Sequence, residues 1–229
     1  MKEYKESNIN LQKGAIATFD VMAKETQAMS KKALNGSMQF FTDKIGDVKL
    51  SKLVMEMLLS SAELVTPNFV ALQVIKYAAT AKAPNTIKEG CNFITLLIEE
   101  FGPLIPLKET IDFAKVAAAH ATPAVRQAAM KLFKEIYKHV GDALRNFMSD
   151  IKDSTLKMID VELKAVTQYS KGEHEPSRLL RGAAAEAAAA KGGGGKKGGG
   201  GGGGGGGGVA DILDSLPRQD ITKKLSAKV

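Results

Sequence analysis

The sequence predicts an all-α solenoid of stacked helix pairs, followed by a disordered linker rich in glycine and alanine. Two observations lead to this fold class. A short motif, a β-branched apolar residue followed by a cation, recurs along the first 170 residues. Apolar residues also recur at steps of three and four, and no window of useful length alternates apolar with polar residues. Helices are therefore expected, and strands are not.

The motif recurs at intervals of 39 and 38 residues, as Val48-Lys49, Ile87-Lys88 and Val125-Arg126. Each copy opens an apolar helical run, and a weaker copy without the cation begins 39 residues earlier, at Ile9. A fixed period near 40 built from helix pairs is typical of HEAT-type solenoids, in which each unit packs against the next. We expect the motif cations to be structural, each pairing with an acid of the neighbouring repeat.

Caps and breakers mark the helix boundaries. Thr66-Pro67 and Thr122-Pro123 each offer an N-cap followed by a proline in the first turn, and Ala83-Pro84 is a poorer version. Glycines stand where helices should end, at Gly46, Gly102 and Gly141. The expected helices are 7–27, 31–45, 49–63, 67–81, 85–101, 107–120, 123–140, 142–151 and 153–169. Paired in order, they give four repeats, 7–45, 49–81, 85–120 and 123–151, and a closing helix.

Three segments are expected. Residues 1–170 form the solenoid domain, 171–208 form a flexible low-complexity linker, and 209–229 form the truncated start of a second, similar module. Glycine runs without interruption over 198–208, which excludes a stable helix there. The first helix has apolar positions that require a partner, yet few residues precede it. We therefore expect the domain to lack a first repeat upstream; the alternative is that the first helix is frayed.

Composition narrows the class of protein. The chain has 229 residues, a net charge of +7 and one cysteine, Cys91, which we expect to be buried in a protein from a reducing compartment. No apolar stretch approaches the roughly 18–20 residues that span a bilayer, so no membrane association is expected. The basic tail favours weak, salt-sensitive attraction to an acidic surface. Its Lys196-Lys197 pair is isolated among glycines, so no specific nucleic acid is expected.

No residue pattern indicates catalysis. The three histidines, His120, His139 and His174, have no ligand-spaced partner, and the glycine run follows no strand, as a phosphate-binding loop would. Glu99-Glu100 is more typical of a solvated helix face than of an acid–base pair. We therefore expect no enzymatic activity, no catalytic, cofactor-binding or metal-binding residues, and no cofactor.

The turns within the helix pairs should all emerge on one edge of the solenoid. These turns are 26–32, 63–68, 102–108 and 139–145, and their cations are Lys31, Lys32, Lys108 and Arg145. Stacking at intervals of about 10 Å would place them in a row suited to a flat acidic protein surface. Ordinary solvated loop charges are the alternative interpretation.

Several stretches resemble the TOG (tumour overexpressed gene) domains of the microtubule polymerases. The most specific is residues 121–132, Ala-Thr-Pro-Ala-Val-Arg-Gln-Ala-Ala-Met-Lys-Leu, continued by 137–141 and 144–145. Further similar stretches are 41–49, 98–102 and 107–115, and residues 214–221 look like the lead-in to a following TOG domain. The resemblance is closest to a third TOG domain with the linker to the fourth.

The resemblance implies a paddle of HEAT repeats that binds the αβ-tubulin dimer through its intra-repeat turns and, within a polymerase or plus-end regulator, the microtubule lattice. It implies a place in the cytoplasm, at microtubules, the spindle and the microtubule-organising centre. Carried over by position, the tubulin contacts are Lys31, Lys32, Asn68, Lys108 and Arg145. The chain departs from the family in having no tryptophan, which the first repeat usually presents to tubulin. The alternative is a HEAT scaffold or adaptor that binds another protein; no oligomeric state is predicted.

Overall fold

The computed structural model describes residues 8–25, 29–170, 173–182 and 184–186, and these contain helices and turns but no strand. The helices are α1 (Ile9–Glu25), α2 (Lys31–Ile45), α3 (Ser51–Val65), α4 (Pro67–Ala78), α5 (Pro84–Phe101), α6 (Leu107–Ala118), α7 (Pro123–Val140), the 3-10 helix η1 (Gly141–Phe147) and α8 (Asp153–Leu163). The predicted all-α solenoid is confirmed. The expected second module, 209–229, lies outside the described residues.

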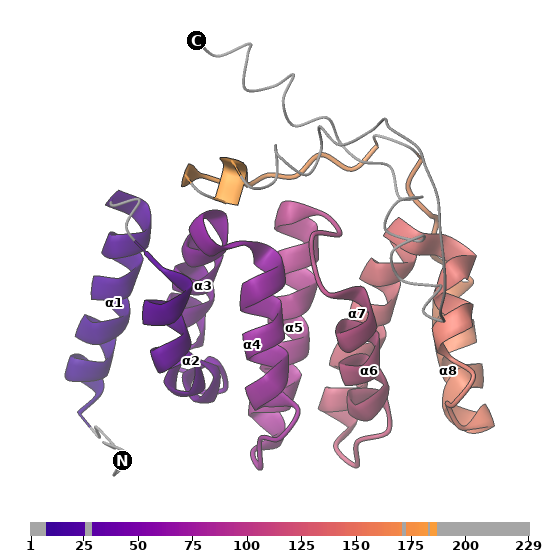
Figure 1. The fold of residues 1–229 in the computed structure, drawn as a ribbon. Coiled ribbons are helices and arrows are strands. Elements are labelled where there is room, and N and C mark those ends of the chain that lie inside the picture. Colours follow the sequence, from indigo (N-terminus) through magenta and orange to yellow (C-terminus); the bar gives the residue numbers. More distant parts are fainter. Residues whose placement is uncertain (1–7, 26–28, 171–172, 183, 187–229) are drawn as a thin grey trace, which may run out of the picture.

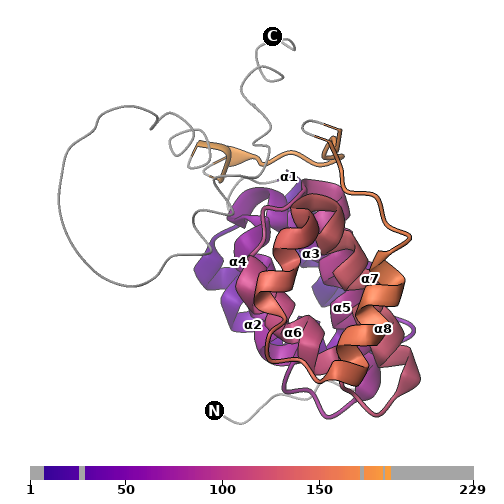
Figure 2. The ribbon, with the colours of Figure 1, turned by 90° about the vertical axis from the view of Figure 1, so that its right-hand side faces the viewer.

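The helices form two parallel rows (Figure 1). The first helix of each pair packs on the first helix of the next, α1 on α3 and α5 on α7, while α2 packs on α4 and α4 on α6. Viewed along the stack in Figure 2, α8 lies at the near end, and it packs on α7. The pairs therefore stack in chain order, as the 39-residue period predicts.

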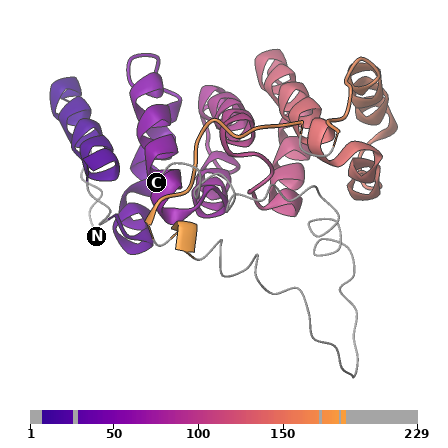
Figure 3. The same ribbon diagram turned by 90° about the horizontal axis from the view of Figure 1, so that it is seen from above.

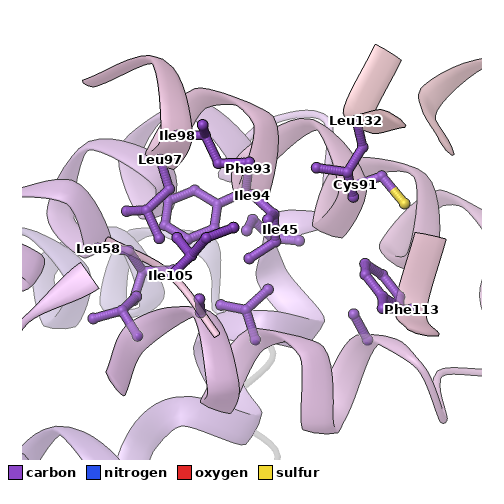
Figure 4. Close-up of a cluster of buried hydrophobic side chains, with 14 of the residues drawn as sticks. Ile45, Leu58, Cys91, Phe93, Ile94, Leu97, Ile98, Ile105, Phe113 and Leu132 are labelled. Carbon is purple, nitrogen blue, oxygen red and sulfur yellow. The ribbon is translucent and has the colours of Figure 1, made fainter. Parts of the chain in front are cut away.

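The core runs through the stack as one continuous cluster of apolar side chains. Its largest members are five phenylalanines that are each no more than 2% exposed, Phe41, Phe93, Phe101, Phe113 and Phe133. Figure 4 shows Phe93 among buried side chains that come from several helices. Cys91 is buried as expected, and burial raises the pKa of its thiol to about 12, so it packs as a small apolar group.

The predicted helix boundaries hold in part. Gly102 and Gly141 end α5 and α7 with φ of 74° and 56°, a region that residues with a Cβ rarely adopt. The Thr66 hydroxyl accepts a hydrogen bond from the Phe69 amide and caps α4. Thr122 does not cap α7 with its side chain, contrary to expectation. Its own amide instead donates to His120 Nδ1, at 3.0 Å.

The expected helices at 142–151 and 153–169 are both wrong in extent. The first is only the short 3-10 helix η1, and polar residues beyond it, which compete for backbone hydrogen bonds, form turns. The closing helix α8 ends at Leu163. The chain then turns back, and the Tyr169 amide donates to the Lys138 carbonyl at the end of α7, at 2.7 Å.

The repeat motif is not equivalent in its three copies. Ile87 and Val125 are buried inside α5 and α7, but Val48 is 91% exposed. The reason is that α3 begins only at Ser51, without the proline that starts α5 and α7, and the buried Leu50 takes the place of Val48 in the core. The motif spacing is therefore kept in all three copies, although in the first copy the buried position moves from Val48 to Leu50.

Among the residues that the structure describes, none of the motif cations Lys49, Lys88 and Arg126 forms an ion pair with an acid of another repeat, so this prediction is wrong. Lys88 pairs with the adjacent Glu89, at 2.7 Å. The Arg126 guanidinium donates to the carbonyls of His120 and Ala121, at 2.9 and 2.6 Å. The two carbonyls belong to the turn between the third and fourth repeats, so Arg126 has a structural role there, but its partners are not acids.

The outer face of α1 carries exposed apolar side chains, with Leu11 59% and Val21 57% exposed. The inner face, including Ile16 and Ala23, is fully buried and packs towards α3. None of the helices within the described ranges combines the length and apolar character needed to cross a bilayer.

Candidate functional site

One edge of the solenoid carries the turns within the helix pairs. Along this edge the first-helix row consists of the C-terminal ends of α1, α3, α5 and α7, and the second-helix row consists of the N-terminal ends of α2, α4 and α6. Helix C-termini carry partial negative charge and N-termini partial positive charge. The two rows therefore have opposite polarity before any side chain is considered.

The second-helix row carries four of the five predicted contact residues. Lys31 and Lys32 begin α2, Asn68 lies in the first turn of α4, and Lys108 lies in the first turn of α6; all four are exposed. Lys31 Nζ lies 5.7 Å from the centre of the Phe69 ring of α4, an interaction that links two repeats. The structure thus places these side chains on one edge, as the sequence predicted.

Arg145, the fifth predicted contact, differs from the lysines. It lies in η1, and its guanidinium pairs with Asp160 of α8 at 2.7 Å and, through Nε, with Asp142 at 3.6 Å. The hydrogen bond with Asp160 raises the pKa of Arg145 above its usual value. Its charge is already partly neutralised within the domain, whereas among the described residues Lys32 and Lys108 have no recorded ion pair.

The middle of the first-helix row, at α3 and α5, is acidic, whereas the last turns of α1 and α7 carry Lys24 and Lys138. Helix α3 carries Glu63 in its last turn and α5 carries Glu99 and Glu100, and neither helix has a cation in its last turn. A carboxylate at a helix C-terminus is unfavourable, because it adds to the negative end of the helix dipole. These helix ends therefore require positive charge from elsewhere in the fold.

That charge comes from residues 173–182, here called the strap, which run along the edge (orange in Figures 1 and 3). The Arg178 guanidinium contacts three carboxylates from two helices, α3 and α5. It donates to both carboxylate oxygens of Glu56 at 2.9 and 3.0 Å and to Glu63 at 2.9 Å, and its Nε lies 3.6 Å from Glu100. Burial opposes ionisation of Arg178, but the hydrogen bonds with Glu56 and Glu63 raise its pKa overall.

The strap also donates hydrogen bonds to main-chain carbonyls at the C-terminal ends of α1, α3 and α5. The amides of Arg178 and Arg181 donate to the carbonyls of Glu100 and Glu63, at 3.0 and 2.7 Å. The Arg181 guanidinium lies 2.6 Å from the Glu63 carboxylate and donates to the Ala23 carbonyl of α1, at 2.9 Å. Carbonyls in the last turn of a helix have no partner within the helix, so the strap satisfies groups that would otherwise need water.

An aromatic cluster anchors the start of the strap beside α7. The rings of His139, Tyr169 and His174 lie 4.8–5.3 Å apart, and His174 Nε2 lies 3.1 Å from the Glu99 carbonyl. Burial, together with the neighbouring His139, lowers the pKa of His174, which favours the neutral ring. The structure therefore brings together two histidines that the sequence left apart, yet the described residues contain no group of three or more ligands that could hold a metal.

The strap corrects the expectation that the whole of 171–208 is a flexible linker, because residues 173–182 make defined contacts with the domain and Ala184 is buried. Glu100, predicted to be solvated, accepts a hydrogen bond from Ser177 of the strap. Two features of the sequence could have indicated that this segment docks on the domain. The Pro-Ser-Arg-Leu-Leu-Arg stretch differs from the glycine-rich tract after it, and two helices end on unpaired glutamates.

A solenoid of helix pairs with a charged row of intra-repeat turns is typical of a protein-binding module. Comparison with known proteins gives the family. Residues 2–163 match the family described as XMAP215/Dis1/CLASP, TOG domain, and the chain therefore belongs to this family. Its position within a series of TOG domains stays a prediction.

Relatives and solved structures agree with this assignment. The chain is 28% identical to protein MOR1 of Arabidopsis thaliana over 229 residues, which cover 97% of this chain and 10% of MOR1. It is 27% identical to centrosomal protein 224 of Dictyostelium discoideum over 169 residues, 71% of this chain and 8% of that protein. The chain thus spans about a tenth of the curated relatives it matches.

Two solved structures share the fold. The TOG3 domain of Drosophila melanogaster Mini spindles superposes with a TM-score of 0.70 at 22% identity, covering 79% of this chain and 78% of that one. A structure described as concerning tubulin recruitment and assembly by microtubule polymerases with TOG domain arrays gives 0.61 at 16% identity, covering 76% and 38%. At these identities the likeness shows the fold.

Proposed function

We propose that this chain is a tubulin-binding module of a microtubule polymerase or plus-end regulator, and that its intra-repeat edge contacts αβ-tubulin. The observation that carries the proposal is the second-helix row, where Lys31 and Lys32 stand exposed at the start of α2 and Lys108 at the start of α6 in a TOG-family solenoid. The module acts by binding, without catalysis and without a cofactor.

The electrostatics of the edge suit an acidic, flat partner. Each lysine of the second-helix row adds its charge to the positive end of a helix, so charge and dipole reinforce each other. The Asn68 side chain, at the start of α4, adds an exposed amide that can both donate and accept hydrogen bonds. Arg145 extends the row in our proposal, with a smaller contribution because Asp160 already holds it.

The known relatives support the choice of partner. Solved structures of similar fold are described as concerning TOG–tubulin binding specificity and tubulin recruitment by microtubule polymerases. Curated relatives include a centrosomal protein and a protein named mini spindles. We therefore propose a cytoplasmic location at microtubules, the spindle and the microtubule-organising centre, with the microtubule lattice as a further partner of the longer protein.

A titration of the full chain with purified tubulin tests the proposal. We expect co-elution at low ionic strength and a dissociation constant that rises with salt, because exposed charges are screened within about 10 Å at 0.1 M salt and about 3 Å at 1 M. An unrelated protein of similar negative charge is the control and should not co-elute. Absence of tubulin binding at low salt by a folded chain would contradict the proposal.

A further inference from the structure

We propose that the first-helix row is a binding site for an extended, arginine-bearing segment, that the strap fills this site from within the same chain, and that the strap and tubulin exclude one another from the edge. The first two parts stand on the contacts of the strap alone. The third part rests on the proposed function, because it requires that tubulin approaches the same edge.

The first-helix row presents carboxylate acceptors, and the strap supplies the arginines that bind them. Glu56, Glu63 and Glu100 come from α3 and α5 and converge on the single guanidinium of Arg178. Glu63 is shared, because Arg181 also pairs with it. Charged hydrogen bonds of this kind are the stronger class, and arginine suits them because its planar fork can engage several carboxylate oxygens at once.

Backbone contacts fix the direction and register of the ligand. The two strap amides that donate to the ends of α5 and α3, those of Arg178 and Arg181, are three positions apart in the sequence. Arg181 then reaches the end of α1, and His174 lies against the end of α5, beside the Gly102 turn. A segment that contacts the ends of successive first helices in this way follows the long axis of the solenoid, as Figure 3 shows.

The docked strap occupies the surface that a partner of the edge would need. Figure 1 shows the strap running along the edge above the helix ends, and Figure 3 shows it passing between the two rows. Packed helices lie about 8–10 Å apart, so a flat partner that contacts the second-helix row also reaches the first-helix row. With the strap in place, that partner meets the strap before it meets the turns.

The docking is suited to displacement. The side chains of Arg178 and Arg181 remain 22% and 33% exposed, so their ion pairs are partly solvated and sensitive to salt. Nine residues, 164–172, connect the strap to the end of α8, and this short tether gives the strap a high effective concentration at its site. A strap docked in about nine of ten molecules would weaken the apparent affinity of a competing partner about tenfold.

The test releases the strap in the full chain by Arg178→Glu with Arg181→Glu. A matched control, Lys49→Glu with Lys82→Glu, makes the same charge change at exposed positions in the turns between repeats, on the opposite edge. Two quantities are measured for each chain: the hydrogen-exchange protection of the amides of residues 178 and 181, and the dissociation constant for tubulin. Circular dichroism reports whether the helical body is intact.

We expect the strap variant to lose protection at both amides and to bind tubulin about tenfold more tightly than wild type. The control should keep the protection and bind no more tightly. The expected gain runs against the added negative charge, which by itself would weaken attraction to an acidic partner. If the double variant fails to fold, Ser177→Glu serves instead, because it places a second carboxylate beside Glu100 while changing only an exposed strap residue.

Other outcomes overturn the proposal in distinguishable ways. Unprotected amides 178 and 181 in wild type would show that the strap does not occupy the first-helix row. A released strap with unchanged or weaker tubulin binding would overturn the competition and leave the proposed function standing. If neither chain binds tubulin although exchange shows the strap docked in one and released in the other, the proposed function fails and the competition fails with it.

Discussion

Replacement of Phe93 by alanine is expected to lower the free energy of unfolding by about 3–5 kcal/mol, the range for deleting a buried aromatic ring. Phe93 is fully buried in α5, and α5 lies in the middle of the stack, where it packs on α7, α4 and α2 (Figure 4). In a solenoid each repeat is stabilised by its neighbours, so a cavity at this position weakens several interfaces at once.

Chemical denaturation monitored by circular dichroism measures this effect. Phe40→Ala is the matched control, because Phe40 is only half-buried and contacts the core at its margin. We expect a clearly smaller loss there. Equal losses at the two positions would mean that the stack is not held together through the α5 core.

Reversal of two charges in the second-helix row, Lys32→Glu with Lys108→Glu, is expected to raise the dissociation constant for tubulin about tenfold or more. The substitutions remove two attractive charges and introduce like-charge repulsion against an acidic partner. Both side chains are exposed and have no recorded ion pair in the described part of the chain, so the fold should tolerate the change. The measurement is the tubulin titration, at low salt.

The same charge change on the opposite edge, Lys49→Glu with Lys82→Glu, should leave the affinity nearly unchanged. Arg145→Ala should weaken binding less than the double reversal, since Arg145 is already paired with Asp160. Affinity that does not respond to the Lys32 and Lys108 reversals in a folded chain would favour the alternative of a HEAT scaffold that binds another protein.

The sequence was sufficient for the fold because the solenoid is built from a repeated local pattern. The 39-residue interval, the prolines that open α5 and α7, and Gly102 and Gly141 at helix ends are all local signals. The predictions that were wrong also concerned local features. Val48 keeps the interval but not the burial, because a helix can begin two residues late and place Leu50 in the core instead.

The site could be predicted only in part. The lysines of the second-helix row follow from knowing which turns share an edge, and that follows from pairing the helices. The strap does not follow, because Arg178 lies more than 110 residues from Glu63 and Glu56, and no periodic pattern connects them. Acids at the ends of α3 and α5 indicated a missing cation without indicating which one.

Hydrogen exchange of the full chain with and without tubulin tests most directly whether the intra-repeat edge is the contact surface. We predict that tubulin slows amide exchange in the turns 63–68, 102–108 and 139–145. We predict no change in the opposite turns, 46–50, 79–83 and 119–122. Protection confined to the opposite turns, or spread evenly over both edges, would contradict the proposed contact surface.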